Sequence, residues 1–448
     1  MSIAVTDGAT GRRYPALAAL ISLVTFATLQ ALALWRTGGA FEYPLDDVYI
    51  HLSMAAQIVK GGYGVNDGEY ASAASSILYP LLLTPFSETG FHRYLPLIWN
   101  TAAVIAAGWL WGMVVARAAG ADSRLRMLMT LVALIGPLAF NIAGIGVTGM
   151  EHALHVAATL AVLVGLERFL REGVVGWLLI AGILAGPMLR FEGLAISGLA
   201  CMVLLFSGRP ATAVLAGLGA LLPVAVFAWV MTSIGLDPMP NSVQAKLLAA
   251  MPGVADRPLL RQFVVLIHNL AQPPGLAIGL MTLFWLGAGL FAPRLRRPPA
   301  AWMWRVLVGA GAAHLVFGQI GWLDRYEIYV VVWIAGWSLI LAAPWMARAG
   351  LAGPLARIAT VAALFAGSFH YLVDMSLRGP LGARSIHLQQ YQMARFAKDY
   401  VRAPVAVNDL GWVAYRNPHY VLDLWGLASR EALATRLTDP GPGWAGPL

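Results

Sequence analysis

Long runs of apolar residues constrain this chain more than any other feature of its sequence. A helix needs roughly 20 apolar residues to cross the hydrocarbon core of a bilayer. The 448-residue chain contains eleven candidate runs, which lie near 15–35, 95–116, 127–147, 151–168, 174–189, 193–207, 211–234, 273–291, 302–320, 327–346 and 354–373. Only 12% of the residues are charged, against about 25% in soluble proteins. We therefore expect an α-helical polytopic membrane protein with about 11 transmembrane helices.

The basic residues predict how these spans are oriented. With the N-terminus on the cytoplasmic side, the short inner segments hold 14 basic and 4 acidic residues, a net charge of +10. The outer segments hold the other 16 basic and 18 acidic residues, a net charge of −2. This distribution follows the positive-inside rule. It places the C-terminus outside, and it accounts for the total charge of +8 without nucleic acid as a partner.

Three outer segments are long, namely 36–94, 235–272 and 374–448. We divide the chain into a transmembrane module, 1–373, and an extracytoplasmic C-terminal segment, 374–448. The C-terminal segment has a helical pattern at 394–398 and short strand patterns at 404–408 and 420–423, which predict a small α/β cap. Its 75 residues leave open whether the cap is a complete domain. Long segments on one side of the membrane indicate that the protein carries out its function on that side.

Polar residues gather at the outer ends of several different spans. Because independent loops that meet on one face can form a site between helices, we expect these residues to converge. The set comprises Asp46, Asp47, Glu151, Arg190, Glu192, Asn241, Lys246, Asp324, Arg325 and Glu327.

The pair Asp46 and Asp47 is the sharpest feature of this set. Two adjacent carboxylates repel, so one of them should have a raised pKa unless a cation lies between them. That arrangement suits a general base or a ligand of a divalent cation, Mg²⁺ or Mn²⁺. The alternative is that the pair caps a helix predicted at 48–59, since Asp is favoured at helix N-caps.

The other charged residues also allow two interpretations each. Glu151 is either functional, as ionisable groups at membrane depth usually are, or an acid at a helix N-terminus. Arg190 either pairs with Glu192 or binds a phosphate, for which its bidentate geometry is suited. Lys246 is either a point charge on a phosphate or a snorkelling interfacial residue. Arg325 either forms an ion pair with its neighbour Asp324 or binds a phosphate.

Taken in order, several motifs resemble those of GT-C glycosyltransferases, most closely the bacterial arabinofuranosyltransferase-type and mannosyltransferase-type members. The first outer segment contributes the stretches 46–51, 60–64, 66–69 and 75–80. Gly-Met-Glu at 149–151, Arg-Phe-Glu-Gly at 190–193 and Met-Pro-Asn-Ser-Val-Gln-Ala-Lys at 239–246 resemble three further family motifs. The stretches 409–411 and 423–427 resemble a motif pair of the outer domain. Phe191 stands where the family usually has Pro, and 73–77 lacks the family's aromatic-Thr-Ser-Pro pattern.

The resemblance implies an inverting transfer of a sugar from a polyprenyl-phosphate donor to a hydroxyl of a glycan, lipid or protein. The active site would face outward from the bacterial cytoplasmic membrane, among membrane lipids. Arg190, Lys246 and Arg325 would bind the donor phosphate, and Asp46 or Asp47 would accept the proton. We expect no cofactor other than the divalent cation considered above.

Two other classes of protein remain as alternatives. A flippase for lipid-linked glycans or a secondary transporter would share the spans and the buried charges, but transporters favour ionisable residues near the midplane. The charges here lie at the outer ends, which favours an enzyme. An O-antigen-type polymerase would instead use two lipid-linked oligosaccharides.

Overall fold

The structure is a computed structural model that describes residues 8–120, 122–243, 245 and 257–438. Within these ranges nine helices are long and apolar enough to cross a membrane, and two shorter apolar helices accompany them. The shorter two, Trp177–Leu189 and Gly193–Phe206, correspond to the two runs that are short for a span. The chain is therefore α-helical, and its long apolar helices are typical of a membrane-embedded protein, as predicted.

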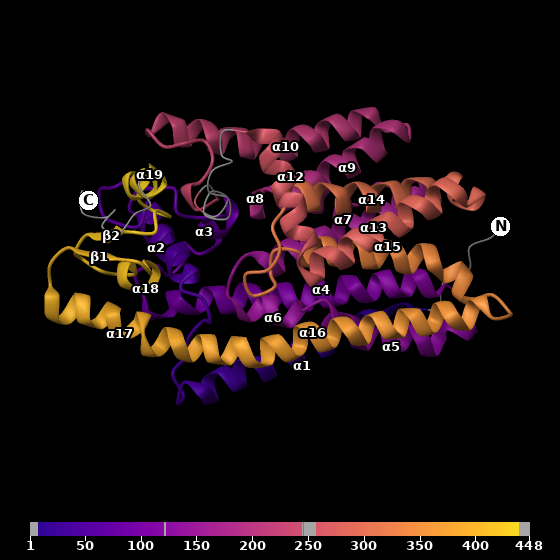
Figure 1. Ribbon diagram of the computed structural model, residues 1–448, viewed down its shortest axis with the longest axis horizontal. Coiled ribbons are helices and arrows are strands. Elements are labelled where there is room, and N and C mark those ends of the chain that lie inside the picture. Colours follow the sequence, from indigo (N-terminus) through magenta and orange to yellow (C-terminus); the bar gives the residue numbers. More distant parts are fainter. Residues whose placement is uncertain (1–7, 121, 244, 246–256, 439–448) are drawn as a thin grey trace.

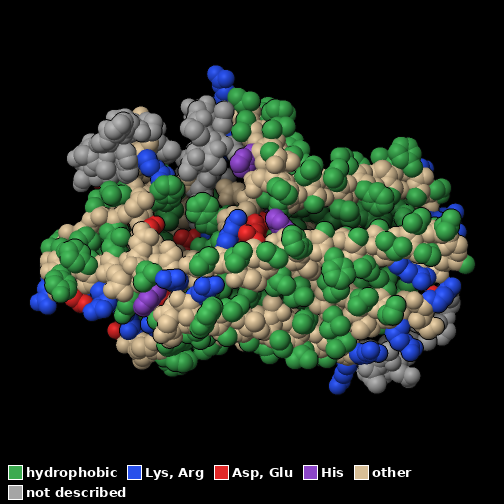
Figure 2. Space-filling model, turned by 60° about the horizontal axis from the view of Figure 1, so that its bottom comes forward, with side chains coloured by type: hydrophobic (Ala, Val, Ile, Leu, Met, Phe, Trp, Pro, Cys, Tyr) green, Lys and Arg blue, Asp and Glu red, His purple; other side chains and the backbone are tan. Residues whose placement is uncertain are grey.

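The helices run side by side along the long axis of the molecule (Figure 1). Their bounds are α1 Gly8–Arg36, α4 Leu95–Ala119, α5 Arg126–Ala139, α6 Ile142–Val147, α7 His152–Glu172, α8 Trp177–Leu189, α9 Gly193–Phe206, α10 Pro210–Ser233, α12 Pro258–Leu270, α13 Pro273–Phe291, α14 Ala300–Phe317, α15 Ile328–Met346 and α16 Ala352–Leu388. Hydrophobic side chains cover much of the face in Figure 2, and Lys and Arg side chains lie at both ends, with Asp and Glu side chains among them at the end of the C-terminal elements.

Small residues allow the long helices to pack closely. A Cβ atom at Gly108 or Gly112 of α4 would overlap backbone atoms of α1. The spacing of these two glycines places them on one face of α4, which is the arrangement that brings membrane helices together. The centre of the bundle is then filled by large side chains, including the fully buried Trp111, Trp333 and Trp337.

Two of the predicted spans differ in detail from the helices. The run at 127–147 is divided into α5 and α6, because Asn141 between them has a left-handed backbone with a φ of 51°. Asn tolerates this conformation better than most residues. The run at 354–373 is part of α16, whose 37 residues extend well past it. At 1.5 Å per residue such a helix is about 55 Å long, far more than the bilayer core requires.

The small elements gather at one end of the bundle (Figure 1). They are α2 Asp47–Val59, α3 Leu78–Leu82, α17 Gln390–Arg395, β1 Val405–Val407, α18 Gly411–Ala414, β2 Val421–Asp423 and α19 Arg430–Thr438. The two strands pair in parallel, with Val405 opposite Val421, and confirm the strands predicted at 404–408 and 420–423. Residues of the first outer segment and of the C-terminal segment share one hydrophobic core, so the two segments pack as a unit.

Candidate functional site

A buried ion-paired cluster lies where α7, α8 and α9 meet at the end of the bundle that carries α2. Arg190 follows α8, and its Nη1 atom donates to Oε1 of Glu151 at 2.8 Å. Its Nη2 atom donates to Oε1 of Glu192 at 2.7 Å. Glu151, which precedes α7, is fully buried. A carboxylate in that position is stable as an ion only because the guanidinium compensates its charge.

Arg325 brings a second ion pair to the same place. Its Nη2 atom donates to Oδ2 of Asp47 at 2.9 Å, and its side chain is 0% exposed whereas that of Asp47 is 22% exposed. The two halves of the site share Tyr326. The guanidinium carbons of Arg190 and Arg325 lie 5.1 and 5.2 Å from the centre of its ring. The predicted convergence is thus confirmed for Asp47, Glu151, Arg190, Glu192 and Arg325.

Uncharged and His side chains complete the surroundings of Glu151 and Arg190. The hydroxyl of Ser75 donates to Glu151 Oε1 at 3.0 Å, and His51 Nε2 lies 3.9 Å from Glu151 Oε2. His152 Nε2 accepts from Arg190 Nη1 at 3.0 Å. Ser75 was missed as a site residue, although it begins the 75–80 stretch that carries part of the family resemblance.

The charges in the cluster stabilise one another. Burial alone would raise the pKa of Glu151, but the charges of Arg190, His51 and Arg325 and a backbone hydrogen bond together outweigh burial and lower that pKa. Burial would also raise the pKa of Glu192, and Arg190 lowers it to about 2 through its charge and hydrogen bond. In turn, burial lowers the pKa of Arg190, but the two carboxylates more than reverse the effect. All three groups are therefore ionised at neutral pH.

Asp46 has different partners from its neighbour Asp47. Its carboxylate accepts from the backbone N–H of Gly411 at 2.6 Å and of Trp412 at 2.9 Å, in the first turn of α18. The helix predicted after the pair is confirmed as α2, and Asp46 occupies its N-cap position, but the Asp46 side chain makes no capping hydrogen bond to α2. Desolvation raises the pKa of Asp46 to about 7 despite the two N–H donors.

This divergence bears on the predicted cation site. The Asp46 oxygens accept from backbone N–H groups of α18, and Asp47 binds Arg325, so the two carboxylates are directed to different partners. Among the described residues no group of three or more His, Cys, Asp or Glu side chains is arranged to hold a metal ion. The use of the pair as Mg²⁺ or Mn²⁺ ligands stays a prediction.

Three predicted residues do not join the ion-paired cluster among the described residues. Asp324 is buried, and among the described residues the ion pair of Arg325 is with Asp47 and not with Asp324. Asn241 is buried. Lys246 lies outside the described residues.

The C-terminal segment is fastened to the first outer segment close to this cluster. The side-chain amide of Asn66 donates to the carbonyl of Val421 at 3.0 Å and accepts from its N–H at 2.9 Å. The Trp412 ring stacks on Tyr49 with centroids 4.1 Å apart. Asp423 accepts from two backbone N–H groups of its own turn, so its motif builds that turn.

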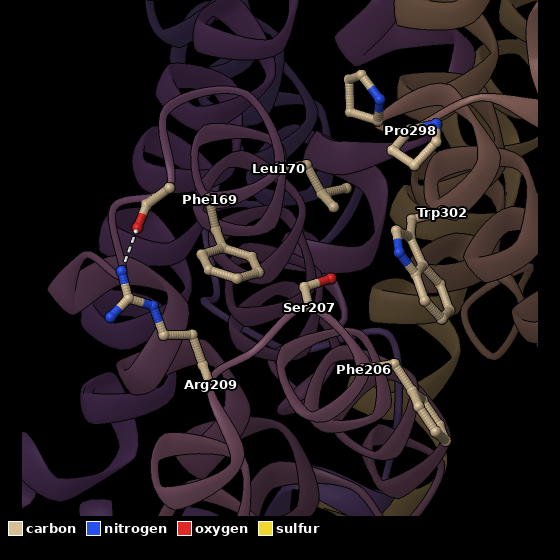
Figure 3. A pocket seen from close by; sticks show the side chains of 9 residues that line it. Phe169, Leu170, Phe206, Ser207, Arg209, Pro298 and Trp302 are labelled. Atoms are coloured by element: carbon tan, nitrogen blue, oxygen red, sulfur yellow. Dashed lines mark hydrogen bonds between the residues drawn. The ribbon is translucent and has the colours of Figure 1, made fainter.

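A hollow of about 400 Å³ lies at the far end of α7 from the cluster (Figure 3). Its lining is mostly apolar and aromatic, and includes Phe169, Leu170, Phe206 and Trp302. Arg209, the charged residue among those that line it, donates to the carbonyl of Gly173. The hollow brings together no acid and base that could act on a substrate, so the ion-paired cluster is the candidate site.

Comparison with known families gives a match in the C-terminal segment. Residues 384–445 match a family described as a domain of unknown function, DUF8728. No curated protein sequence matches the chain. The matched stretch includes the strands and α18, which contacts Asp46, and it excludes Asp47, Glu151, Arg190 and Arg325.

Proposed function

We propose that this protein is an inverting glycosyltransferase of the GT-C type. It would move a sugar from a polyprenyl-phosphate donor to an acceptor hydroxyl at the outer face of a bacterial cytoplasmic membrane. One observation carries the proposal: a partly exposed carboxylate, Asp47, lies against a fully buried guanidinium, Arg325, at one end of an apolar helical bundle. A base and a phosphate-binding cation are the two groups that this reaction needs side by side.

Arg325 is suited to bind the donor phosphate. Its Nε and Nη1 atoms are buried and have no hydrogen-bond partner among the described residues. Buried donors without partners are costly, and a phosphate oxygen would satisfy them in the bidentate manner that Arg favours. Arg190 is already engaged by Glu151 and Glu192, so we assign it to holding the site together. Lys246 remains a predicted third cation.

Asp47 is the better candidate for the base. Its side chain is accessible, whereas the Asp46 carboxylate is occupied by the N–H groups of α18. In the reaction the acceptor oxygen bonds to the anomeric carbon while the bond from that carbon to the phosphate oxygen breaks. The polyprenyl phosphate leaves with the electron pair, and the acceptor proton passes to Asp47. A single displacement of this kind inverts the configuration, and Arg325 would stabilise the charge that develops on the phosphate.

The rest of the molecule supports a lipid-linked donor. Large apolar side chains such as Leu215, Leu222 and Trp229 point outward from α10, where a bilayer or a polyprenyl chain would cover them. The charge distribution supports the proposed orientation, because the predicted inner segments hold 14 basic residues and only 4 acidic ones, as the positive-inside rule expects.

The test is to incubate the purified protein with a panel of polyprenyl-phosphate sugars and candidate acceptors, and to measure release of polyprenyl phosphate. We expect release with one donor, and loss of release in Asp47→Asn. The matched control is Asp67→Asn, which changes an exposed carboxylate of the same outer segment that pairs with Lys60. A parallel series with EDTA tests for a divalent cation. Unchanged release in Asp47→Asn would refute the assignment of the base.

The same preparation separates the alternatives. A flippase or transporter would move lipid-linked sugar between the leaflets of a vesicle and release no lipid phosphate. A polymerase would require lipid-linked oligosaccharides on both sides of the reaction. Absence of release with every donor, together with movement between leaflets, would overturn the proposal in favour of transport.

A further inference from the structure

A second hollow, of about 510 Å³, lies at the end of the bundle opposite the ion-paired cluster. Its lining comes from the loop after α13 and from the end of α15: Ala292, Pro293, Arg294, Trp345 and Arg348. α15 begins three residues after Arg325 and has 19 residues. At 1.5 Å per residue it separates the hollow from the cluster by roughly 30 Å, which is the thickness of the hydrocarbon core of a bilayer.

The two guanidiniums that line this hollow have no carboxylate beside them. The sequence contains no Asp or Glu at 257–323 or at 328–373, so α13, α14 and α15 contribute none. The described carboxylates at this end are Asp122, Glu167 and Glu172, and each pairs with an Arg of its own loop, of α4 or of α7. Within the part of the chain that the structure describes, neither Arg294 nor Arg348 forms an ion pair.

Other Arg residues at this end of the bundle have partners within the protein. Arg296 and Arg357 each donate to a backbone carbonyl, and Arg305 lies over two Trp rings. In the hollow of Figure 3, Arg209 likewise donates to a carbonyl. The two guanidiniums of the second hollow are therefore the ones placed to bind a ligand. Because they carry the same charge they repel each other, and an anion between them would remove that repulsion.

The surroundings of the hollow suit the boundary between a bilayer and water. Trp345 contributes to its wall, and Trp is enriched at membrane interfaces. α13 leads to the hollow with an exposed apolar face formed by Leu280, Phe284 and Phe291, whose spacing of 4 and 7 residues places them on one side of the helix. Gly287 lies on the same side, and a Cβ atom there would meet nothing within 4 Å. This face has room for an acyl chain.

We infer that this hollow binds the headgroup of an anionic phospholipid in the leaflet opposite the ion-paired cluster. Arg294 and Arg348 bind the phosphate oxygens, for which guanidinium geometry is suited, and the acyl chains follow the apolar face of α13. A zwitterionic headgroup fits less well, because its ammonium would find two guanidiniums and no carboxylate. With the predicted orientation this is the cytoplasmic leaflet, whose anionic lipids attract basic groups. The inference does not rest on the proposed function, since the donor phosphate is assigned to the other end of the bundle.

The first experiment counts the lipids bound to the purified full chain by native mass spectrometry, with phosphatidylglycerol or phosphatidylcholine added to the detergent. We expect the wild type to retain phosphatidylglycerol at concentrations at which phosphatidylcholine does not bind. The double variant Arg294→Gln with Arg348→Gln should bind it about thirtyfold more weakly, because two charges are lost. The matched control is Arg12→Gln with Arg13→Gln, which removes two exposed Arg residues from α1, a helix that packs on α4 and α5. The control should bind as the wild type does.

The second experiment measures the rise in melting temperature when the same lipids are added. A ligand that binds the folded state alone stabilises it. We expect phosphatidylglycerol to raise the melting temperature of the wild type and of the control more than that of the double Gln variant. Each rise is taken from the melting temperature of the same protein without lipid, so a less stable variant still gives an answer. Glycerol 1-phosphate, which has the phosphate but no acyl chains, should give no rise at the same concentration.

Three results would overturn the inference. Equal retention of phosphatidylglycerol by the wild type and the double Gln variant would show that the lipid does not bind in this hollow. An equal loss in the Arg12 and Arg13 control would show a general attraction between anionic lipid and the basic end of the bundle. An equal rise in melting temperature with glycerol 1-phosphate would identify a site for a free phosphate and not for a lipid. Each result can be read whether or not the wild type releases polyprenyl phosphate.

Discussion

Replacing Arg190 with Met should destabilise the protein far more than replacing an exposed Arg. The change leaves Glu151, whose side chain is 0% exposed, without the guanidinium 2.8 Å away. Glu192 also loses a partner, but it is partly exposed and can be hydrated. Removing one member of a buried ion pair costs about 3–5 kcal/mol. That range corresponds to a change of roughly a hundredfold to several thousandfold in the unfolding equilibrium.

The measurement is thermal denaturation in detergent, with a double-mutant cycle. Arg168→Met is the matched control, because this exposed Arg pairs with Glu172 one turn along α7, and such a pair contributes only about 0.3–0.5 kcal/mol. The double variant Arg190→Met with Glu151→Gln should recover part of the loss, since the amide needs no counter-charge and can still accept from Ser75. Double-mutant cycles of residues in contact give interaction energies of about 0.5–3 kcal/mol.

The pH dependence of stability provides a second, independent test of this prediction. In the wild type the folded-state pKa of Glu151 is lowered, so its contribution to stability is lost as the pH falls. Without Arg190 the burial of Glu151 dominates and raises that pKa, so Arg190→Met should gain stability as the pH falls. If Arg190→Met melts together with Arg168→Met, or if the double variant is no more stable than Arg190→Met alone, the buried pair does not hold the site together.

Three further predictions concern the neighbouring contacts. Asp47→Asn should abolish polyprenyl phosphate release and leave the melting temperature within a few degrees of the wild type; a large loss of stability would instead give Asp47 a structural role. Gly411→Ala should loosen the C-terminal segment, because the added Cβ would overlap the carbonyl and carboxylate of Asp46, at a cost of about 1–3 kcal/mol. Limited proteolysis should then cleave that segment faster, while Gly198→Ala, which meets open space in α9, leaves the rate unchanged or lower. Asn66→Ala should cost about 1–3 kcal/mol by leaving the backbone of β2 unpaired, and equal thermal stability of variant and wild type would refute it.

The helices could be predicted from the sequence because apolar length is a local property of the chain. All eleven runs coincide with apolar helices, including the two short ones. The break at Asn141 could not be predicted in the same way. Its left-handed backbone accompanies a hydrogen bond to the carbonyl of Asp324, which is 183 residues away in the chain. A local pattern contains no information about such a contact.

The candidate site could likewise be predicted from the sequence only in part. Topology placed the ends of different spans on one face, which was sufficient to expect Asp47, Glu151, Arg190, Glu192 and Arg325 together. It did not determine the pairs. Asp47 and Arg325 are 278 residues apart in the chain, and only the packing of α2 beside the loop before α15 brings them into contact. The left-handed turn at 322–324, which presents Arg325, has no signal in the sequence beyond a single Gly321.

The two adjacent carboxylates show why sequence proximity is a poor guide to a shared role. Consecutive residues at the start of a helix point about 100° apart, so Asp46 and Asp47 diverge as α2 begins. One meets the backbone of α18 and the other meets Arg325. Because the two residues are adjacent, however, the docking of the C-terminal segment on Asp46 fixes the backbone from which Asp47 projects. Loosening α18 should therefore disturb the site, although α18 contributes no side chain to the ion-paired cluster.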